Sequence, residues 1–267
     1  MKERLDVLLV RNNFFSSRER AKAAVMEGHI YVDGRISDKP GTLTDTKAEI
    51  IVRKDTCPFV SRGGLKLLKA INSFGISLEG RTCMDIGAST GGFTDCMLQH
   101  GAAKVYAVDV GYGQLAYSLR NDQRVVNIER CNFRYFDTDS IGQSIDFMSI
   151  DVSFISLKLI FPVAVRMLKD AAAMTALIKP QFEAGRSQVG KNGVVRDVSI
   201  REQVISDVIG FAADSGLTAR GLDFSPITGA KGNVEFLLYL NKGDNIGYNI
   251  DADCIHDVAV RSQSELG

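Results

Sequence analysis

The sequence predicts an α/β protein in which a small N-terminal α+β module precedes a doubly wound sheet. Two observations predict this organisation. From residue 81 onward, short apolar runs alternate with helical stretches, the pattern of parallel strands joined by helices. Before that point, two short helical patterns lead into a tight Asp-Gly turn, which is typical of a small hairpin module. The chain has 267 residues, 45% of them hydrophobic, which is enough for both parts.

The composition argues against several classes of protein. The 32 Lys and Arg balance 32 Asp and Glu, and the five cysteines are widely spaced without a Cys-x-x-Cys pair. We therefore expect neither a disulfide framework nor a zinc cluster. The three histidines have no metal-ligand spacing, so no metal is expected. No apolar run approaches the roughly 18 to 20 residues of a membrane span, and no apolar leader follows the first residues, so we expect a soluble, cytoplasmic protein.

The N-terminal module should contain two helices and a hairpin. Three leucines at helical spacing predict a first helix within residues 3–12. A capping box, Ser16 with Glu19, predicts the start of a second helix, which should stop at Gly28. After it, Asp33-Gly34 lies between strand-like residues and predicts the tight turn of a hairpin.

The order of these elements resembles the S-four-like αL RNA-binding domain over about residues 3 to 55. In that family the second helix lays basic side chains along RNA phosphates. The resemblance implies the same role for five cations here: Arg4, Arg18, Arg20, Lys22 and Arg35. The first 72 residues hold 14 Lys and Arg against 9 Asp and Glu, which fits that role. Phosphate contacts supply affinity without choosing a sequence. The alternative is a small module that contacts protein.

A further helix is expected after a linker at residues 57–61. Arg62, Lys66 and Lys69 recur at spacings of four and three residues, which places them side by side on one helical face. We expect Arg62 and Lys69 to contribute to RNA binding.

Six apolar runs predict the strands of the sheet, at residues 82–86, 104–110, 125–128, 145–150, 174–178 and 234–240. The tail from residue 251 is expected to form a final helix or to be partly disordered. The expected boundaries are therefore a module at 1–56, a linker at 57–61, a sheet domain at 62–243 and a C-terminal tail at 244–267.

A glycine-rich loop follows the first predicted strand and passes directly into a helix. Such a loop lets the backbone approach a ligand closely. An acid stands at its start and another ends the next strand, where an acid binds ribose hydroxyls. A ribose-bearing cofactor with a cationic centre tolerates the extra acid better than a dinucleotide does, so we expect S-adenosylmethionine. The residues expected to hold it are Asp85, Gly87, Ser89, Gly91, Gly92, Phe93 and Asp109.

Charged residues also stand near the ends of other predicted strands. Asp151 and Lys179 each follow an apolar run, where ligands gather in open α/β sheets. Glu235 lies inside the run 234–240, where an ionised carboxylate needs a partner such as Lys179. Taken one at a time, these residues are equally well interpreted as ordinary ion-paired residues at the rim of the sheet.

Together with Lys66, they resemble the Lys-Asp-Lys-Glu tetrad of the FtsJ-like ribose 2′-O-methyltransferases. With the N-terminal module and the segments 61–67, 151–156 and 179–183, the chain resembles the TlyA family from about residue 3 to 241. The resemblance implies a Rossmann-like class I methyltransferase domain, S-adenosylmethionine as cofactor, and rRNA (cytidine-2′-O)-methyltransferase activity. It also implies ribosomal RNA, or a ribosomal subunit, as the partner.

The chemistry assigns a role to each member of this tetrad. A ribose hydroxyl must lose its proton as it attacks the sulfonium methyl group, so a base is required. Neighbouring positive charges favour the neutral form of a lysine, and we expect Lys179 to be that base. Lys66 then orients the ribose, while Asp151 and Glu235 hold the two amines.

Two alternative functions remain at this stage, and one segment has two possible interpretations. Family members are often labelled hemolysins, so one alternative function is that of a membrane-active protein. A second is an RNA-binding protein without catalysis. Residues 185–197, where glycines alternate with basic residues, form either a mobile basic flap over RNA or an ordinary solvated loop.

Overall fold

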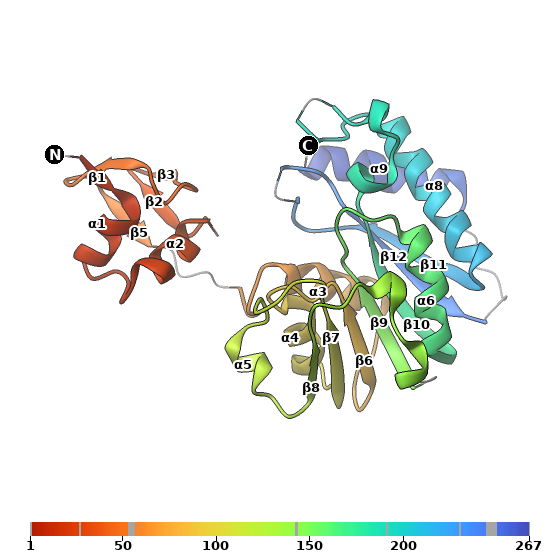
Figure 1. The fold of residues 1–267 in the computed structure, drawn as a ribbon. Helices are drawn as coiled ribbons and strands as arrows, with labels where there is room; N and C mark the ends of the chain where they lie inside the picture. Colours follow the sequence, from red (N-terminus) through yellow and green to blue (C-terminus); the bar gives the residue numbers. More distant parts are fainter. Residues whose placement is uncertain are drawn as a thin grey trace. The chain divides into compact units, whose positions relative to one another are not determined.

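The computed structural model describes residues 2–26, 28–52, 57–141, 144–190, 192–229, 231–243 and 250–266. The chain divides into two compact units, Met1–Pro58 and Phe59–Gly267, which are described separately (Figure 1).

The described residues of the first unit form two short helices and five short strands. The helices are α1 (Leu5–Arg11) and α2 (Arg18–Met26), and the strands are β1 (Lys2–Arg4), β2 (Ile30–Val32), β3 (Arg35–Ile36), β4 (Leu43–Asp45) and β5 (Ile50–Val52). Strand β1 pairs with β4, and β2 lies between β3 and β5, all antiparallel. Both residues of the Asp33-Gly34 turn have positive φ, 49° and 77°, so the predicted tight hairpin is confirmed.

The ends of α2 show one correct and one wrong prediction. The helix starts at Arg18, so Ser17, and not Ser16, accepts the backbone N–H of Arg20, at 3.3 Å. The Ser16 hydroxyl accepts from the Arg20 guanidinium instead, at 3.2 Å. At the other end, Gly28 has φ of 79° and its N–H donates to the Val25 carbonyl, as expected of a glycine stop.

A buried carboxylate links the two helices of this unit. Asp6 accepts from Arg4 Nε at 3.0 Å and from Arg18 Nη2 at 2.8 Å, although both arginine side chains are about half exposed. These arginines hold the pKa of Asp6 at about 2, against the opposing effect of burial. Two of the five cations expected to bind RNA are therefore positioned by an acid inside the unit.

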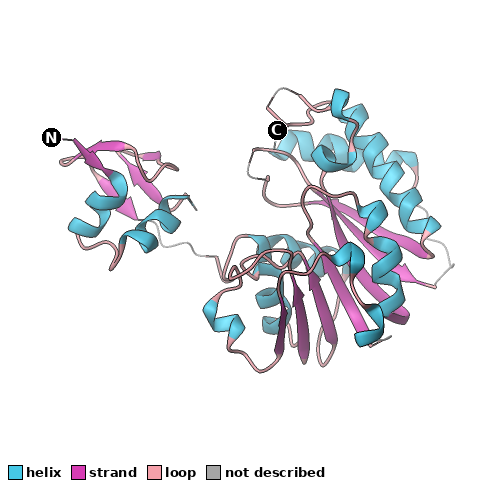
Figure 2. Cartoon of the chain, viewed as in Figure 1, coloured by secondary structure: helices cyan, strands magenta, loops and turns pink. Residues whose placement is uncertain are grey.

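The second unit is a seven-stranded sheet with helices on both faces (Figure 2). The strand order is β11-β12-β10-β9-β6-β7-β8, in which β6 to β10 are parallel and β12 runs antiparallel to both neighbours. The strands are β6 (Thr82–Ile86), β7 (Lys104–Val108), β8 (Val125–Ile128), β9 (Ile145–Ile150), β10 (Leu168–Ile178), β11 (Leu217–Phe224) and β12 (Phe236–Lys242). The expected doubly wound α/β architecture is confirmed.

The helices divide between the two faces of this sheet (Figure 1). Helices α6, α8 and α9 pack with the sheet in one large apolar cluster. Helices α3 and α4 pack on each other at the opposite face. The bounds are α3 (Gly63–Phe74), α4 (Gly92–Gln99), α5 (Tyr117–Arg120), α6 (Phe161–Met167), α7 (Pro180–Glu183), α8 (Val198–Asp214) and α9 (Ala252–Leu266).

Two features differ from the sequence predictions, and for the tail the structure decides between the two alternatives left open. Strand β11 was not predicted, because most of its residues are only half buried and Gly221 interrupts its pattern. Strand β12 begins at Phe236, so Glu235 precedes the strand and does not lie inside it. The tail contains a complete helix, α9, whose Ile255 and Val258 join the main core, while residues 244–249 and 267 lie outside the described residues.

Within the described residues, no helix combines the length and the apolar character that crossing a bilayer requires.

The Asp6 cluster predicts a pH-dependent contribution to stability. The folded carboxyl has a pKa of about 2 and an ordinary value near 3.8. Its contribution is therefore complete above about pH 4 and is lost as the pH falls towards 2. We expect Asp6→Asn to lower Tm by about 5 °C near pH 7, and this difference to shrink in acid. Calorimetry of the full chain measures it. The exposed Asp38→Asn is the control, and a constant difference in Tm down to about pH 2.5 would contradict the assignment.

Candidate active site

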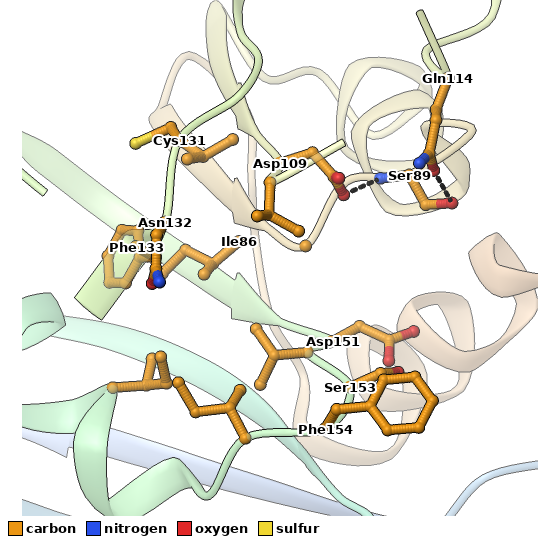
Figure 3. A pocket seen from close by; sticks show the side chains of 16 residues that line it. Ile86, Ser89, Asp109, Gln114, Cys131, Asn132, Phe133, Asp151, Ser153 and Phe154 are labelled. Carbon is orange, nitrogen blue, oxygen red and sulfur yellow. Dashed lines mark hydrogen bonds between the residues drawn. The ribbon is translucent and has the colours of Figure 1, made fainter. Parts of the chain in front are cut away.

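A cavity of about 520 Å³ opens at the carboxyl ends of the parallel strands. This volume lies in the range of small-molecule sites. Figure 3 shows Ser89 and Asp109 at one side of it and Asp151 with Phe154 at another. The cavity is lined by Ile86, Gly87, Ser89, Val108, Asp109, Val110, Gln114, Cys131, Asn132, Phe133, Asp151, Val152, Ser153, Phe154, Ile155 and Ile160.

The loop after β6 approaches the neighbouring backbone so closely that it needs a glycine. Gly87 has φ of 89°, and a Cβ there would lie 2.5 Å from the carbonyl oxygen of Asp151. Its N–H donates to the Val108 carbonyl at 2.8 Å. At Gly87, in the cavity wall, the loop therefore contacts the ends of both strands that flank β6 in the sheet, β7 and β9.

Asp109 holds the far side of the same loop. Its two carboxylate oxygens accept from the backbone N–H of Ser89 at 2.8 Å and of Gly111 at 2.6 Å. The Ser89 hydroxyl in turn donates to Gln114 Oε1 at 3.2 Å (Figure 3). Because a carboxylate offers about four acceptor positions, Asp109 keeps lone pairs for hydroxyl groups of a ligand.

Asp85 was expected to contact the cofactor, but it is fully buried, and the cavity lining found among the described residues does not include it. Its Oδ2 accepts from the backbone N–H and the hydroxyl of Thr94, at 2.9 and 2.7 Å, and its Oδ1 accepts from the Ser149 hydroxyl at 3.3 Å. Burial raises the pKa of Asp85 to about 7; the Thr94 bonds oppose the shift and the charge of Asp151 adds to it. Asp85 therefore fixes α4 to the sheet.

Three further residues of the predicted cofactor set also have packing roles. A Cβ on Gly91 would meet the side chain of Leu119, and one on Gly92 would meet the Ser61 hydroxyl. Phe93 is buried. In the described chain these residues pack the start of α4 against its neighbours and lie outside the cavity lining. The structure thus leaves Gly87, Ser89 and Asp109 of the predicted set at the cavity.

The four members of the predicted tetrad converge. Lys66 Nζ, from α3, lies 2.6 Å from Glu235 Oε2 and 3.4 Å from Asp151 Oδ2. Lys179 Nζ lies 2.5 Å from Asp151 Oδ1 and donates to the Ser153 hydroxyl at 3.1 Å.

The sheet register explains why residues so far apart in sequence meet. Antiparallel pairing of Ile178 with Phe236 makes Lys179 and Glu235 neighbours just beyond the paired residues. Asp151 is the first residue after the adjacent strand β9.

The tetrad is a buried and mutually compensated cluster of charges. Lys66 and Lys179 are each 8% exposed and Glu235 is 3% exposed. Burial acts to lower the pKa of Lys66, but the charges of Asp151 and Glu235 raise it overall. Burial acts to raise the pKa of Asp151, but the two lysines lower it overall. Opposite charges in the cluster therefore stabilise the charged forms of Lys66 and Asp151 where little water reaches them.

The other predicted RNA-binding cations do not act as one row. On α3, Lys66 enters the tetrad, while Lys69 Nζ lies 3.2 Å from Asp223 Oδ2 and 4.6 Å from the centre of the Phe224 ring. Arg62 is exposed at the start of the helix. Helical spacing predicted a shared face correctly, but the partners across that face separate the three cations. In the first unit, Arg20 and Arg35 are exposed and Lys22 is half-buried.

Some residues at the cavity were not identified from the sequence. Ser153 contacts Lys179, and its position two residues after Asp151 was an available signal. Phe154 is 90% exposed with φ of 63°, and its ring lies 4.8 Å from that of Phe182. Phe154 falls within the segment 151–156 that carries the family resemblance, but no periodicity marks an exposed aromatic in a loop as a cavity residue. The cavity is also lined by residues that no sequence pattern singled out: Gln114, Cys131, Asn132 and Phe133.

Both units of the chain match known protein families. Residues 59–242 match the model of the FtsJ-like methyltransferases and residues 3–50 match the S4 domain. YqxC of Bacillus subtilis is 51% identical over 241 residues, which are 90% of this chain and 86% of that protein. The 16S/23S rRNA (cytidine-2′-O)-methyltransferase TlyA of Mycobacterium tuberculosis is 44% identical over 238 residues, 89% of each chain. A solved structure named as a hemolysin, from Streptococcus thermophilus, is 48% identical with a TM-score of 0.79, covering 99% of this chain and 96% of that one.

The close approach at Gly87 predicts a defect in binding of the expected cofactor. Gly87→Ala combines an unfavourable φ with a collision against the Asp151 carbonyl. We expect affinity for S-adenosylmethionine, measured by isothermal titration, to fall about 10-fold or more. Gly80→Ala is the matched control, because Gly80 also has positive φ, 69°, but has open space around its Cβ position. Equal affinities for the two variants would show that backbone strain alone, and not this contact, matters.

Proposed function

The chain belongs to the FtsJ-like methyltransferase family, and from this we propose that it transfers the methyl group of S-adenosylmethionine to a ribose 2′-hydroxyl of ribosomal RNA. The observation that carries the proposal is the meeting of Lys66, Asp151, Lys179 and Glu235 beside the cavity. The similarity to a TlyA rRNA (cytidine-2′-O)-methyltransferase supports cytidine as the target nucleoside.

The residues at the cavity fit S-adenosylmethionine, which would supply an electrophilic methyl group on sulfur. Asp109 retains acceptor positions suited to ribose hydroxyls, and the backbone around Gly87 and Ser89 forms the adjoining wall. Asp151 brings negative charge to the opposite part of the lining, where it would favour a cationic centre. Asp85 would act one step removed, by holding the loop.

The contacts of the two lysines divide their roles. Lys66 lies between two carboxylates, which raise its pKa and keep it charged, so it suits orienting the ribose oxygen. Lys179 contacts one carboxylate and the neutral Ser153 hydroxyl, and we assign the proton transfer to this second amine. In its amine form, Lys179 takes the 2′-hydroxyl proton as the oxygen bonds to the methyl carbon. The carbon–sulfur bond breaks and its electron pair stays on sulfur.

The S4 domain would supply affinity for the RNA. Arg20 and Arg35 are exposed, Lys22 is half-buried, and Arg4 and Arg18 are held on the surface by Asp6. These five cations suit phosphate contacts, so binding should weaken as salt rises. Arg62 would add a contact from the methyltransferase unit. The partner we propose is ribosomal RNA, free or in a ribosomal subunit, in the cytoplasm.

Mapping 2′-O-methyl groups on ribosomal RNA, with and without the protein, tests the activity directly. We expect at least one cytidine to gain a methyl group only when protein and S-adenosylmethionine are both present. If no position is modified on free RNA or on either ribosomal subunit, the proposal is wrong. Leakage of liposomes caused by the purified protein would instead favour a membrane-active function.

The role of Lys179 predicts a large loss of rate in its absence. Lys179→Ala should slow single-turnover methylation at saturating RNA by about 100-fold or more, because proton transfer by a positioned base is worth that much. Lys158→Ala, which removes an exposed lysine in a nearby turn, should leave the rate unchanged. Retention of more than about a tenth of the rate by Lys179→Ala would exclude Lys179 as the base.

A further inference from the structure

The described part of the glycine-rich segment 185–197 is held by the buried side chain of Asn233. Asn233 Oδ1 accepts from the backbone N–H of Val195 at 3.0 Å, and Asn233 Nδ2 donates to the Gly193 carbonyl at 2.8 Å. Asn233 is 3% exposed and stands two residues before Glu235 of the tetrad. The segment is thus joined to the residues just before β12, where Glu235 of the tetrad lies.

The same segment has a second anchor on the helical side. Arg201 of α8 is 2% exposed, and its Nε donates to the Val195 carbonyl at 3.0 Å. Its Nη1 donates to Gln263 Oε1, on α9, at 2.8 Å. Both backbone polar groups of Val195 are therefore taken by side chains, one from each direction, and α9 is connected to the tetrad through this chain of contacts.

Asn233 also shapes a wall beside the tetrad. Its carbonyl accepts from the Gly229 N–H at 2.9 Å, which closes a turn before β12. A Cβ on Gly229 would lie 2.7 Å from Glu235 Oε1, so this turn packs directly on the acid. A second cavity has a volume of about 630 Å³ and shares no lining residue with the first cavity, at the carboxyl ends of the parallel strands. It is lined by Arg62, Ile227, Thr228, Gly229, Gly232, Glu265 and Leu266.

We propose that Asn233 is a positioning residue for the RNA substrate. It holds the glycine-rich segment, the Gly229 turn and Glu235 in one arrangement, on the side of the tetrad that receives the RNA. The proposal rests on the proposed methyl transfer. An asparagine suits this role because one planar amide both accepts from an N–H and donates to a carbonyl. A shift of Glu235 would move Lys66, which lies 2.6 Å from it, and misplacement by about 1 Å can cost about 100-fold in rate.

The experiment compares three variants of the full chain in steady-state methylation. Asn233→Ala removes both side-chain bonds, Asn233→Asp keeps the acceptor but loses the donor, and Gln263→Ala loosens only the outer anchor. The control is Ser262→Ala, which removes a buried hydroxyl that donates within α9, to the Ala259 carbonyl.

We expect Asn233→Ala to lower kcat by about 10- to 100-fold and to raise KM for RNA. Affinity for S-adenosylmethionine should stay within about twofold of the parent, because Asn233 does not line the cavity expected to hold it. Asn233→Asp should be intermediate and Gln263→Ala milder, in the same direction. A kcat for Asn233→Ala no lower than that of the Ser262→Ala control would overturn the proposal. If Asn233→Ala does not fold, Gln263→Ala, at an exposed position, decides in the same way.

A second readout does not depend on catalysis. The segment contains Arg186, Lys191 and Arg196, so trypsin can cut it once its backbone opens. Cleavage within 185–197 should be about tenfold faster in Asn233→Ala than in the parent or the control, since local opening controls such cleavage. Unchanged cleavage would refute the anchoring role even if the rate of methylation falls. If the parent chain methylates nothing, the proposed function fails, while the cleavage comparison still reports on Asn233.

Discussion

The mutual compensation of two buried amines with the buried Glu235 and the largely buried Asp151 is the constraint on which the site depends. A single charge at any of these positions would be costly away from water, and each becomes tolerable only through the others. Lys66 connects α3 to Glu235, just before β12, and Asp151 contacts both lysines. The cluster therefore works as an internal tie between α3, the two central strand ends and β12. Substituting one member alters the electrostatic environment of the other three, so single substitutions there report on the set.

Another buried carboxylate, that of Asp85, supports the glycine-rich loop beside the first cavity in a different way. Its bonds go to neutral groups of Thr94 and Ser149, and burial raises its pKa to about 7. Asp151 has two lysine partners and its pKa is lowered instead. The two acids lie on neighbouring strands, β6 and just beyond β9, and the presence or absence of a cation separates them in their protonation. One is suited to holding a loop in place and the other to holding amines ready for proton transfer.

Much of this arrangement could be predicted from the sequence, for identifiable reasons. Apolar runs indicated six strands, because strands covered on both faces, the parallel β6 to β10 and most of the antiparallel β12, are nearly continuous in hydrophobic residues. The rule that ligands gather at carboxyl ends singled out Asp151 and Lys179. Ion-pair partners that are distant in sequence were harder to predict. Helical spacing placed Lys66 and Lys69 on one face, but only the fold shows that they pair with Glu235 and Asp223. The glycines of the loop also misled, since a glycine needed by a ligand and one needed by a packed neighbour look alike in sequence.

The reversed direction of β12 has a wider consequence. Because this strand is antiparallel to β10, its beginning lies at the edge where the parallel strands end, and Glu235 reaches the site from the hairpin between β11 and β12. The donor loop, in contrast, belongs to the connection between β6 and α4. Changes of length or sequence in the connection between β11 and β12 would thus alter how the RNA is recognised. The loop that binds the methyl donor would stay the same. Such a division would let relatives diversify their RNA targets on an unchanged framework.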